Sequence, residues 1–252
     1  GRAPASATGV ALTRPDVNVW VVTGDGDALS IGGNHLIHAL RRNVNITVLL
    51  FNNRIYGLTK GQYSPTSEIG KITKSTPFGS LDTPFNPISL ALGAEAGFVA
   101  RSIDSDRKHL TEVLTAAVAH RGASLVEIYQ NCPIFNDDAF ATLKGPEGVL
   151  ISLRHGEPIV FGGGEYCVIR TVDGQYKVAA TADADEASIV VHDETREEPS
   201  QAFALSRLTE PGILRQAPIG IFRRVERPAY DDLVRDQIRT VEAEDQAAAI
   251  AA

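Results

Sequence analysis

Two stretches decide the fold of this chain, VNVWVVTGDGD at residues 17–27 and NITVLLFNN at residues 45–53. Each begins with a short run of apolar residues rich in valine, leucine and isoleucine, which is typical of a buried strand in a parallel sheet. The first run ends in GDGD and the second in NN. Because parallel strands end at the same edge of a sheet, both polar segments should lie at the carboxyl edge, where open α/β sheets bind ligands.

The side chains at these strand ends carry oxygen atoms that suit a divalent cation. Asp25 offers a carboxylate and the asparagines offer amide oxygens, and Mg2+ binds diphosphates through a few such ligands and several waters. A Rossmann fingerprint does not fit, because Leu29 stands where its third glycine belongs, and an EF-hand loop does not fit at positions 29 and 30. A strand-to-helix turn capped by Asp25 or Asp27 remains open beside the cofactor site.

The residues after NN make the pattern more specific. They read RIYGLTKGQYSPTS at 54–67, and GDALSIGGNHLIHALRRN precedes them at 26–43. This sequence, with its GDG…NN signature of thiamine diphosphate enzymes, resembles the β subunits of the 2-oxoacid:ferredoxin oxidoreductases, most of all those that act on 2-oxoglutarate. The resemblance runs from GRAPASATG at residue 1 to EIYQNC at Cys132. It resumes near the end of the chain at APIGIFRRVERPAYDDL.

The resemblance implies the residues of a magnesium–thiamine diphosphate site. Asp25, Asn53 and the main-chain carbonyl of Ile55 would hold the Mg2+. Leu58 matches the position that holds the two rings of the cofactor in a bent form, and Lys60 lies where a cation could meet a substrate carboxylate or coenzyme A. A solvated loop lysine is the alternative for Lys60. The other implied cofactor-binding residues are Gly24, Gly26, Asp27, Tyr56, Gly57 and Thr59, and the glycines would let the backbone approach the phosphates.

The chain has two cysteines and no methionine. Cys132 matches the last thiolate ligand of the family's [4Fe-4S] cluster, whereas Cys167 is expected to be a buried structural thiol. Such a cluster needs four cysteines, and the resemblance places the other three before Gly1. We therefore expect that the N-terminal segment of the family is missing from this chain, and that Cys132 alone does not hold the cluster.

Composition excludes several classes of protein. With 252 residues, of which 43% are hydrophobic, the chain is long enough for a full α/β core. Its net charge of −7 argues against a nucleic-acid partner. We expect no membrane span, because no apolar run reaches about 18 residues. Two cysteines give no disulfide framework and suit a reducing compartment, so a cytoplasmic protein is expected.

Strand and helix patterns alternate along the first part of the chain, which predicts an α/β fold with a mostly parallel sheet and helices on both faces. The segment 54–86 is too long for a simple connector, so we expect it to be functional. We expect residues 1–145 to form the thiamine diphosphate/Mg-binding domain, and 146–252 a small extension with short strands, a hairpin at Asp173-Gly174 and a terminal helix. The predicted strands are 17–23, 45–51, 97–101 and 124–131, and the predicted helices are 28–42, 87–96 and 106–121.

The resemblance also implies an activity. A 2-oxoacid, expected to be 2-oxoglutarate, would be oxidatively decarboxylated to acyl-CoA and CO2, with the chemistry carried by the cofactor and the electrons passed through the cluster to ferredoxin. The glutamate that activates the cofactor would come from an α (or fused γα) subunit, so the chain should be active only in that hetero-oligomer. Two alternatives stay open: a non-redox thiamine diphosphate decarboxylase or synthase subunit, and a noncatalytic α/β scaffold subunit.

Overall fold

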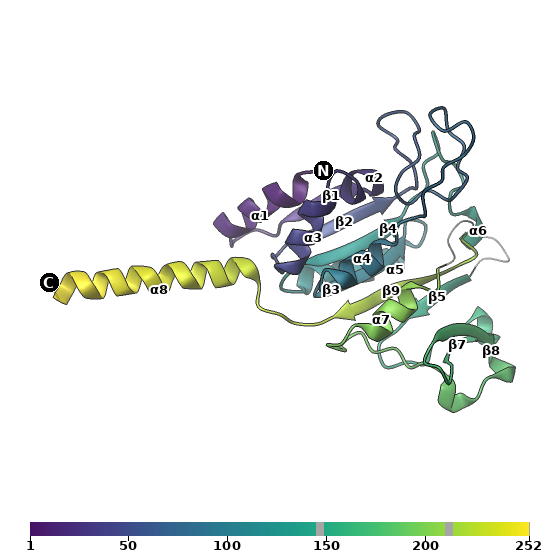
Figure 1. The fold of residues 1–252 in the computed structure, drawn as a ribbon. Coiled ribbons are helices and arrows are strands. Elements are labelled where there is room, and N and C mark those ends of the chain that lie inside the picture. Colours follow the sequence, from purple (N-terminus) through teal and green to yellow (C-terminus); the bar gives the residue numbers. More distant parts are fainter. Residues whose placement is uncertain (145–148, 210–213, 252) are drawn as a thin grey trace.

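The computed structural model describes residues 1–144, 149–209 and 214–251, and its centre is a six-stranded sheet (Figure 1). Strands β1, β2, β4 and β3 pair in parallel, β9 pairs antiparallel with β3, and β5 pairs in parallel with β9. The predicted α/β class with a mostly parallel sheet is therefore confirmed. In spatial order the strands are β1 (Trp20–Gly24), β2 (Thr47–Asn52), β4 (Ser124–Tyr129), β3 (Phe98–Ile103), β9 (Gln216–Arg224) and β5 (Val149–Leu153).

Helices cover both faces of this sheet. Successive strand residues point to opposite faces, and Val48 packs in one apolar cluster with residues of α1, α3, α4 and α7. Leu49 packs in the other cluster, which α5 closes with Val113 and Ala117. The described helices are α1 (Ala3–Thr13), α2 (Asp25–Leu29), α3 (Gly33–Arg41), α4 (Pro87–Gly93), α5 (Arg107–Ala119), α6 (Ala141–Lys144), α7 (Ser200–Ser206) and α8 (Tyr230–Ala251).

Local sequence signals explain where two of these helices begin. Asn86 caps α4 by accepting a hydrogen bond from the Ser89 main-chain N–H at 3.1 Å, and a proline follows the cap. Asp106 caps α5 by accepting from the His109 N–H at 3.0 Å. Both helices start within one residue of the prediction and end two or three residues earlier than predicted.

The predicted helix 28–42 is wrong in one respect, because it is two helices. The short helix α2 begins at Asp25, and the chain turns before α3 begins at Gly33. Gly32 makes this turn possible: its N–H donates to Asp27 O at 2.9 Å, and a Cβ at this position would lie 2.5 Å from the same oxygen. Helix α1 was not predicted from the sequence.

Strand β1 differs from a strand buried on both faces. It is one of the two edge strands of the six-stranded sheet, and the side chains of Trp20 and Val22 are 39% and 66% exposed. They lie on the face opposite Val21, which packs in the cluster with α1 and α3. The expectation of full burial is wrong for β1 because this strand lies at an edge of the sheet and α5 packs over β3 and β4.

The C-terminal part adds a small antiparallel sheet of β6 (Val160–Phe161), β7 (Tyr166–Arg170) and β8 (Tyr176–Ala180). The predicted hairpin at Asp173-Gly174 joins β7 and β8, and Cys167 is buried in β7 as expected. Because β5 and β9 belong to the large sheet, the division at residue 145 stays a prediction. Short 3-10 turns occur at Gly162–Gly164, Thr181–Asp183 and Glu186–Ser188.

Helix α8 follows β9 and extends away from the rest of the chain (Figure 1). Its Arg235 reaches back to α1 and donates to Ala11 O at 3.0 Å. Among the described helices, none combines the length and apolar character that crossing a bilayer requires.

Candidate cofactor site

The two polar segments meet at the carboxyl edge of the sheet. Strands β1 and β2 pair in parallel with Gly24 opposite Phe51, so Asp25 and Asn52 leave the sheet side by side. The segment 54–86 forms the loops beyond this edge (Figure 1). The sequence-based expectation that GDGD and NN lie together therefore agrees with the arrangement of the strands.

Asp25 is 1% exposed and is held by two hydroxyl groups of the long loop. Its Oδ2 accepts hydrogen bonds from Ser64 Oγ at 2.5 Å and from Thr66 Oγ1 at 2.6 Å. Within the described residues, no side-chain hydrogen bond ends on Oδ1. The two hydroxyl groups thus hold the side chain through one carboxylate oxygen, and the main-chain N–H of Asn53 is a further hydrogen-bond donor to the carboxylate.

Burial raises the pKa of the Asp25 carboxyl above its ordinary value. The hydrogen bonds from Ser64, Thr66 and the main-chain N–H of Asn53 act in the opposite direction but do not cancel the effect of burial. The ionised carboxylate is therefore costly at this position unless a positive charge lies beside it. A bound divalent cation supplies such a charge and favours the ionised form.

The turn after β2 presents the other two expected metal ligands. Arg54 has φ +59°, a left-handed conformation that is uncommon for a residue other than glycine. Asn53 Oδ1 accepts a hydrogen bond from the Ile55 N–H at 3.3 Å, and Asn53 O accepts from Asn136 Nδ2 at 2.9 Å. The amide oxygen of Asn53 and the turn that carries Ile55 are thus held by contacts on both sides.

The side chain of Tyr56 leaves no room for a Cβ atom at Gly26. The Tyr56 hydroxyl donates to Gly26 O at 2.9 Å, and a Cβ at Gly26 would overlap the Tyr56 ring. At Gly24 a Cβ would meet only Phe51 O at 4.0 Å, so the space beside this glycine is open. Asp27 accepts a hydrogen bond from Thr23 Oγ1 at 2.9 Å.

The expected ring-supporting and substrate-binding residues lie in a tight loop. Gly61 N–H donates to Tyr56 O at 2.8 Å, and Lys60 N–H donates to Gly57 O at 3.1 Å. Leu58 at the tip of this loop is 97% exposed, and Thr59 beside it is exposed as well. The Lys60 ammonium is also exposed and forms no ion pair within the described part of the chain. The loop therefore presents Leu58 and Lys60 to solvent.

Cys132 lies in a partly exposed loop after β4. Asn136 N–H donates to Cys132 O at 2.9 Å, and the Asn136 side chain reaches Asn53 O, so this loop touches the NN turn. In residues 1–144, 149–209 and 214–251 no group of three or more His, Cys, Asp or Glu side chains is placed to hold a metal ion. Cys132 and Cys167 are both free thiols in the described structure.

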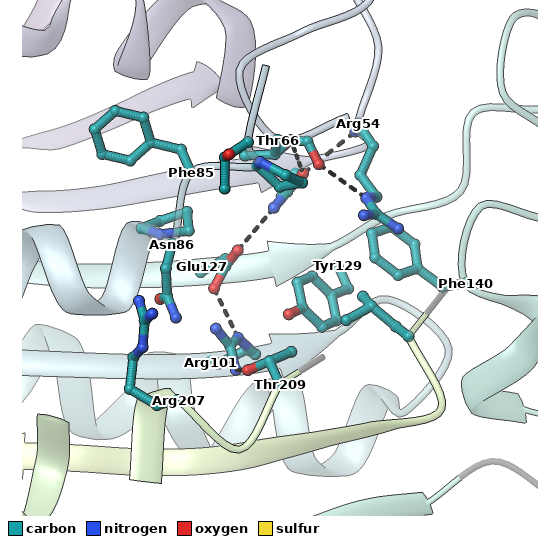
Figure 2. A pocket seen from close by; sticks show the side chains of 15 residues that line it. Arg54, Thr66, Phe85, Asn86, Arg101, Glu127, Tyr129, Phe140, Arg207 and Thr209 are labelled. Atoms are coloured by element: carbon teal, nitrogen blue, oxygen red, sulfur yellow. Dashed lines mark hydrogen bonds and ion pairs between the residues drawn. The ribbon is translucent and has the colours of Figure 1, made fainter. Parts of the chain in front are cut away.

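A buried polar network under the site was not predicted from the sequence. Asn52 Nδ2 donates to Glu127 Oε1 at 2.7 Å, and Arg101 Nε donates to Glu127 Oε2 at 2.7 Å (Figure 2). A cavity of about 180 Å3 adjoins these residues and extends between Phe85 and Phe140. Arg101 and Glu127 stand inside mostly apolar strands, and that pattern was the signal available in the sequence.

Comparison with known proteins agrees with this geometry. The family described as thiamine pyrophosphate enzyme, C-terminal TPP binding domain, matches residues 1–128, and thiamine pyrophosphate is thiamine diphosphate under another name. The chain therefore belongs to the thiamine diphosphate enzymes.

Individual relatives show to which of the thiamine diphosphate enzymes the chain is similar. The chain is 66% identical over 241 residues to the 2-oxoglutarate oxidoreductase subunit KorB of Mycobacterium tuberculosis, covering 94% of this chain and 64% of that protein. It is 45% identical over 133 residues to the 2-oxoglutarate synthase subunit KorB of Archaeoglobus fulgidus, covering 53% of this chain and 50% of that protein. The resemblance to the β subunits of the 2-oxoacid:ferredoxin oxidoreductases is confirmed.

A solved structure is similar over nearly the whole chain. It is the 2-oxoglutarate:ferredoxin oxidoreductase from Magnetococcus marinus with 2-oxoglutarate, coenzyme A and succinyl-CoA bound. The TM-score is 0.71 at 32% identity, and the match covers 95% of this chain and 68% of that one. The chain thus spans between half and about two thirds of the length of these relatives.

Proposed function

We propose that this chain is the thiamine diphosphate-binding subunit of an enzyme that oxidatively decarboxylates a 2-oxoacid, namely 2-oxoglutarate, to acyl-CoA and CO2 and passes the electrons to ferredoxin. One observation carries the proposal: the Asp25 carboxylate is buried beside the NN turn, with two hydroxyl groups bound to one of its oxygens and no side-chain donor on the other within the described residues. Two KorB relatives are named as a 2-oxoglutarate oxidoreductase subunit and a 2-oxoglutarate synthase subunit, and these names support the choice of substrate.

The residues present fit a magnesium ion that carries a diphosphate. Asp25 Oδ1, the Asn53 amide oxygen and the Ile55 carbonyl would be its ligands, which gives three hard oxygen atoms and a single charged group. A diphosphate brings further negative oxygens, so one carboxylate suffices. The absence of any three-acid cluster in the described residues is consistent with such a site. The open space beside Gly24 would admit the phosphates.

Leu58 and Lys60 would complete the site when its ligands bind. Full burial of an exposed leucine side chain lowers the free energy by about 1.5 to 3 kcal/mol. Contact between Leu58 and the cofactor rings would therefore favour binding. Lys60 would attract the distal carboxylate of 2-oxoglutarate or a phosphate of coenzyme A. Thiamine diphosphate itself would supply the carbanion chemistry on the keto carbon, and the residues of this chain would orient it. Gly26, Asp27, Tyr56, Gly57 and Thr59 would form the surrounding wall.

Cys132 would be one of four thiolate ligands of a [4Fe-4S] cluster. Its loop is partly exposed and contacts the NN turn through Asn136, which supports electron transfer between the cofactor and the cluster. The partners would be an α or fused γα subunit, which supplies the missing catalytic glutamate, and ferredoxin. We further propose that residues 1–145 form the cofactor-binding domain, and that the protein is cytoplasmic, since both cysteines are free thiols.

The test is turnover by the intact hetero-oligomer. We expect 2-oxoglutarate to reduce ferredoxin only when coenzyme A, Mg2+ and thiamine diphosphate are all present, with pyruvate as the comparison substrate. Release of CO2 without ferredoxin reduction would favour the non-redox decarboxylase or synthase instead. No turnover of any 2-oxoacid, together with no binding of thiamine diphosphate, would contradict the proposed function and favour the scaffold subunit.

A further inference from the structure

The buried network beneath the site contains an ion pair in an unusual place. Arg101 and Glu127 face each other on the paired strands β3 and β4, and their side chains are each 1% exposed. Arg101 also donates to Pro218 O at 3.2 Å. A buried ion pair contributes little net stability, because removing two charges from water costs about as much as their attraction returns. The pair therefore needs an explanation other than stability of the sheet.

Glu127 uses its second oxygen to orient Asn52. An ionised carboxylate only accepts hydrogen bonds, so Asn52 must present its NH2 group to Glu127 Oε1, at 2.7 Å. Its amide oxygen then points the other way. Close packing does not fix this orientation, because the cavity of about 180 Å3 adjoins both side chains. Two hydrogen bonds do: Glu127 accepts from the NH2 group, and the main-chain N–H of Arg54 donates to the amide oxygen.

The amide oxygen of Asn52 contacts a group that holds Asp25 and a group in the NN turn. Thr66 Oγ1 lies 2.8 Å from Asn52 Oδ1 and 2.6 Å from Asp25 Oδ2. The main-chain N–H of Arg54 donates to the same Asn52 oxygen at 3.2 Å, within the left-handed turn that carries Asn53. Asn52 thus links the support of Asp25 to the support of the NN turn.

We propose that Glu127, paired with Arg101, is a positioning residue of the magnesium–diphosphate site, and that it acts by fixing the amide of Asn52. Through Thr66 this amide sets the position of Asp25, and through Arg54 N–H it sets the turn that presents Asn53 and Ile55. The inference rests on the proposed function, because its consequence is the affinity for Mg2+ and thiamine diphosphate. Neither Glu127 nor Asn52 need touch the cofactor.

A matched pair of double variants in the intact protein tests the role of the acceptor at position 127. Arg101→Met with Glu127→Gln removes both charges but keeps an oxygen that can accept from Asn52. Arg101→Met with Glu127→Leu removes the same charges and the acceptor. Neither leaves a buried unpaired charge, so we expect both to fold with similar melting temperatures. Calorimetric titration with thiamine diphosphate in excess Mg2+ is the readout.

We expect the glutamine variant to bind within about threefold of the wild type and the leucine variant to bind about 10- to 100-fold more weakly, as when residues behind metal ligands are lost. Asn52→Ala, with the ion pair intact, should show the same loss and guards against misfolding of the leucine variant. Wild-type affinity in the leucine variant, or equal losses in both double variants, would overturn this inference alone. No binding by the wild-type protein would overturn the proposed function as well.

Discussion

Replacing Asp25 with asparagine should weaken the binding of thiamine diphosphate without lowering the stability of the cofactor-free protein. The substitution keeps the shape of the side chain and an oxygen that can accept from Ser64 and Thr66, but it removes the charge. An interaction with a charged group is worth about 1.5 to 3 kcal/mol, and each 1.4 kcal/mol corresponds to about tenfold in affinity. We therefore expect thiamine diphosphate to bind roughly 10- to 150-fold more weakly in the presence of Mg2+.

The stability of the cofactor-free protein should respond in the opposite direction. Burial raises the pKa of Asp25, so the folded state binds this proton more tightly than the unfolded chain does. Ionised Asp25 therefore opposes folding at pH values above its pKa in the folded protein. Asparagine removes this opposition, and the melting temperature at neutral pH should stay equal or rise.

The assay combines differential scanning calorimetry of the cofactor-free protein with titration of thiamine diphosphate in excess Mg2+. Asp16→Asn makes the same chemical change at an exposed position outside the site and should alter neither quantity appreciably. Wild-type cofactor affinity in the Asp25→Asn protein would refute the assignment of Asp25 as a metal ligand. A melting temperature several degrees below that of the wild type would refute the argument from burial.

Three further outcomes are expected. Cys132→Ser should remove the broad visible absorption of the iron–sulfur cluster from the intact enzyme and leave thiamine diphosphate binding intact, since a hydroxyl replaces a thiolate poorly on iron; an unchanged spectrum would exclude Cys132 as a ligand. Lys60→Ala should lower kcat/KM roughly ten- to a hundredfold. If Lys60 binds the distal carboxylate, the loss should be confined to 2-oxoglutarate, and if Lys60 binds coenzyme A, pyruvate should show the same loss. Unaltered kinetics would mean that Lys60 is a solvated loop lysine. Burial lowers the pKa of His192, whose Nδ1 has no partner in the described structure, so the free energy of unfolding should fall as the pH drops below about 6.5. In chemical denaturation, the His192→Gln protein should lose less stability over this pH range than the wild type. An equally steep loss in the variant would contradict the role of His192.

Sequence reasoning predicted that GDGD and NN lie at one edge of the sheet because the decisive information was local. The apolar runs before GDGD and NN predict parallel strands, and parallel strands bring Asp25 and Asn53 to one edge. The break at Gly32 was missed because it depends on a close approach to the carbonyl oxygen of Asp27, which periodicity does not report. The exposed face of β1 was missed for a related reason: an apolar strand looks the same whether or not a helix covers it.

The network that supports the site depends on contacts far apart in the chain. Glu127 meets Asn52 across the β2–β4 pair, and Thr66 reaches Asp25 from the long loop. The register between β3 and β4 also decides that Arg101 faces Glu127. No sequence pattern fixes strand order or register over such distances, although a charged residue inside an apolar strand does indicate a buried polar partner.

The most direct test is titration of the intact protein with thiamine diphosphate in two buffers, one containing excess Mg2+ and the other EDTA. Because the cofactor's diphosphate would be held through the metal by Asp25, Asn53 and Ile55, we expect saturable binding in the magnesium buffer and a rise in melting temperature that follows ligand concentration. In EDTA both signals should be lost. Equal binding in the two buffers, or no binding in either, would contradict a magnesium-dependent cofactor site at this edge of the sheet.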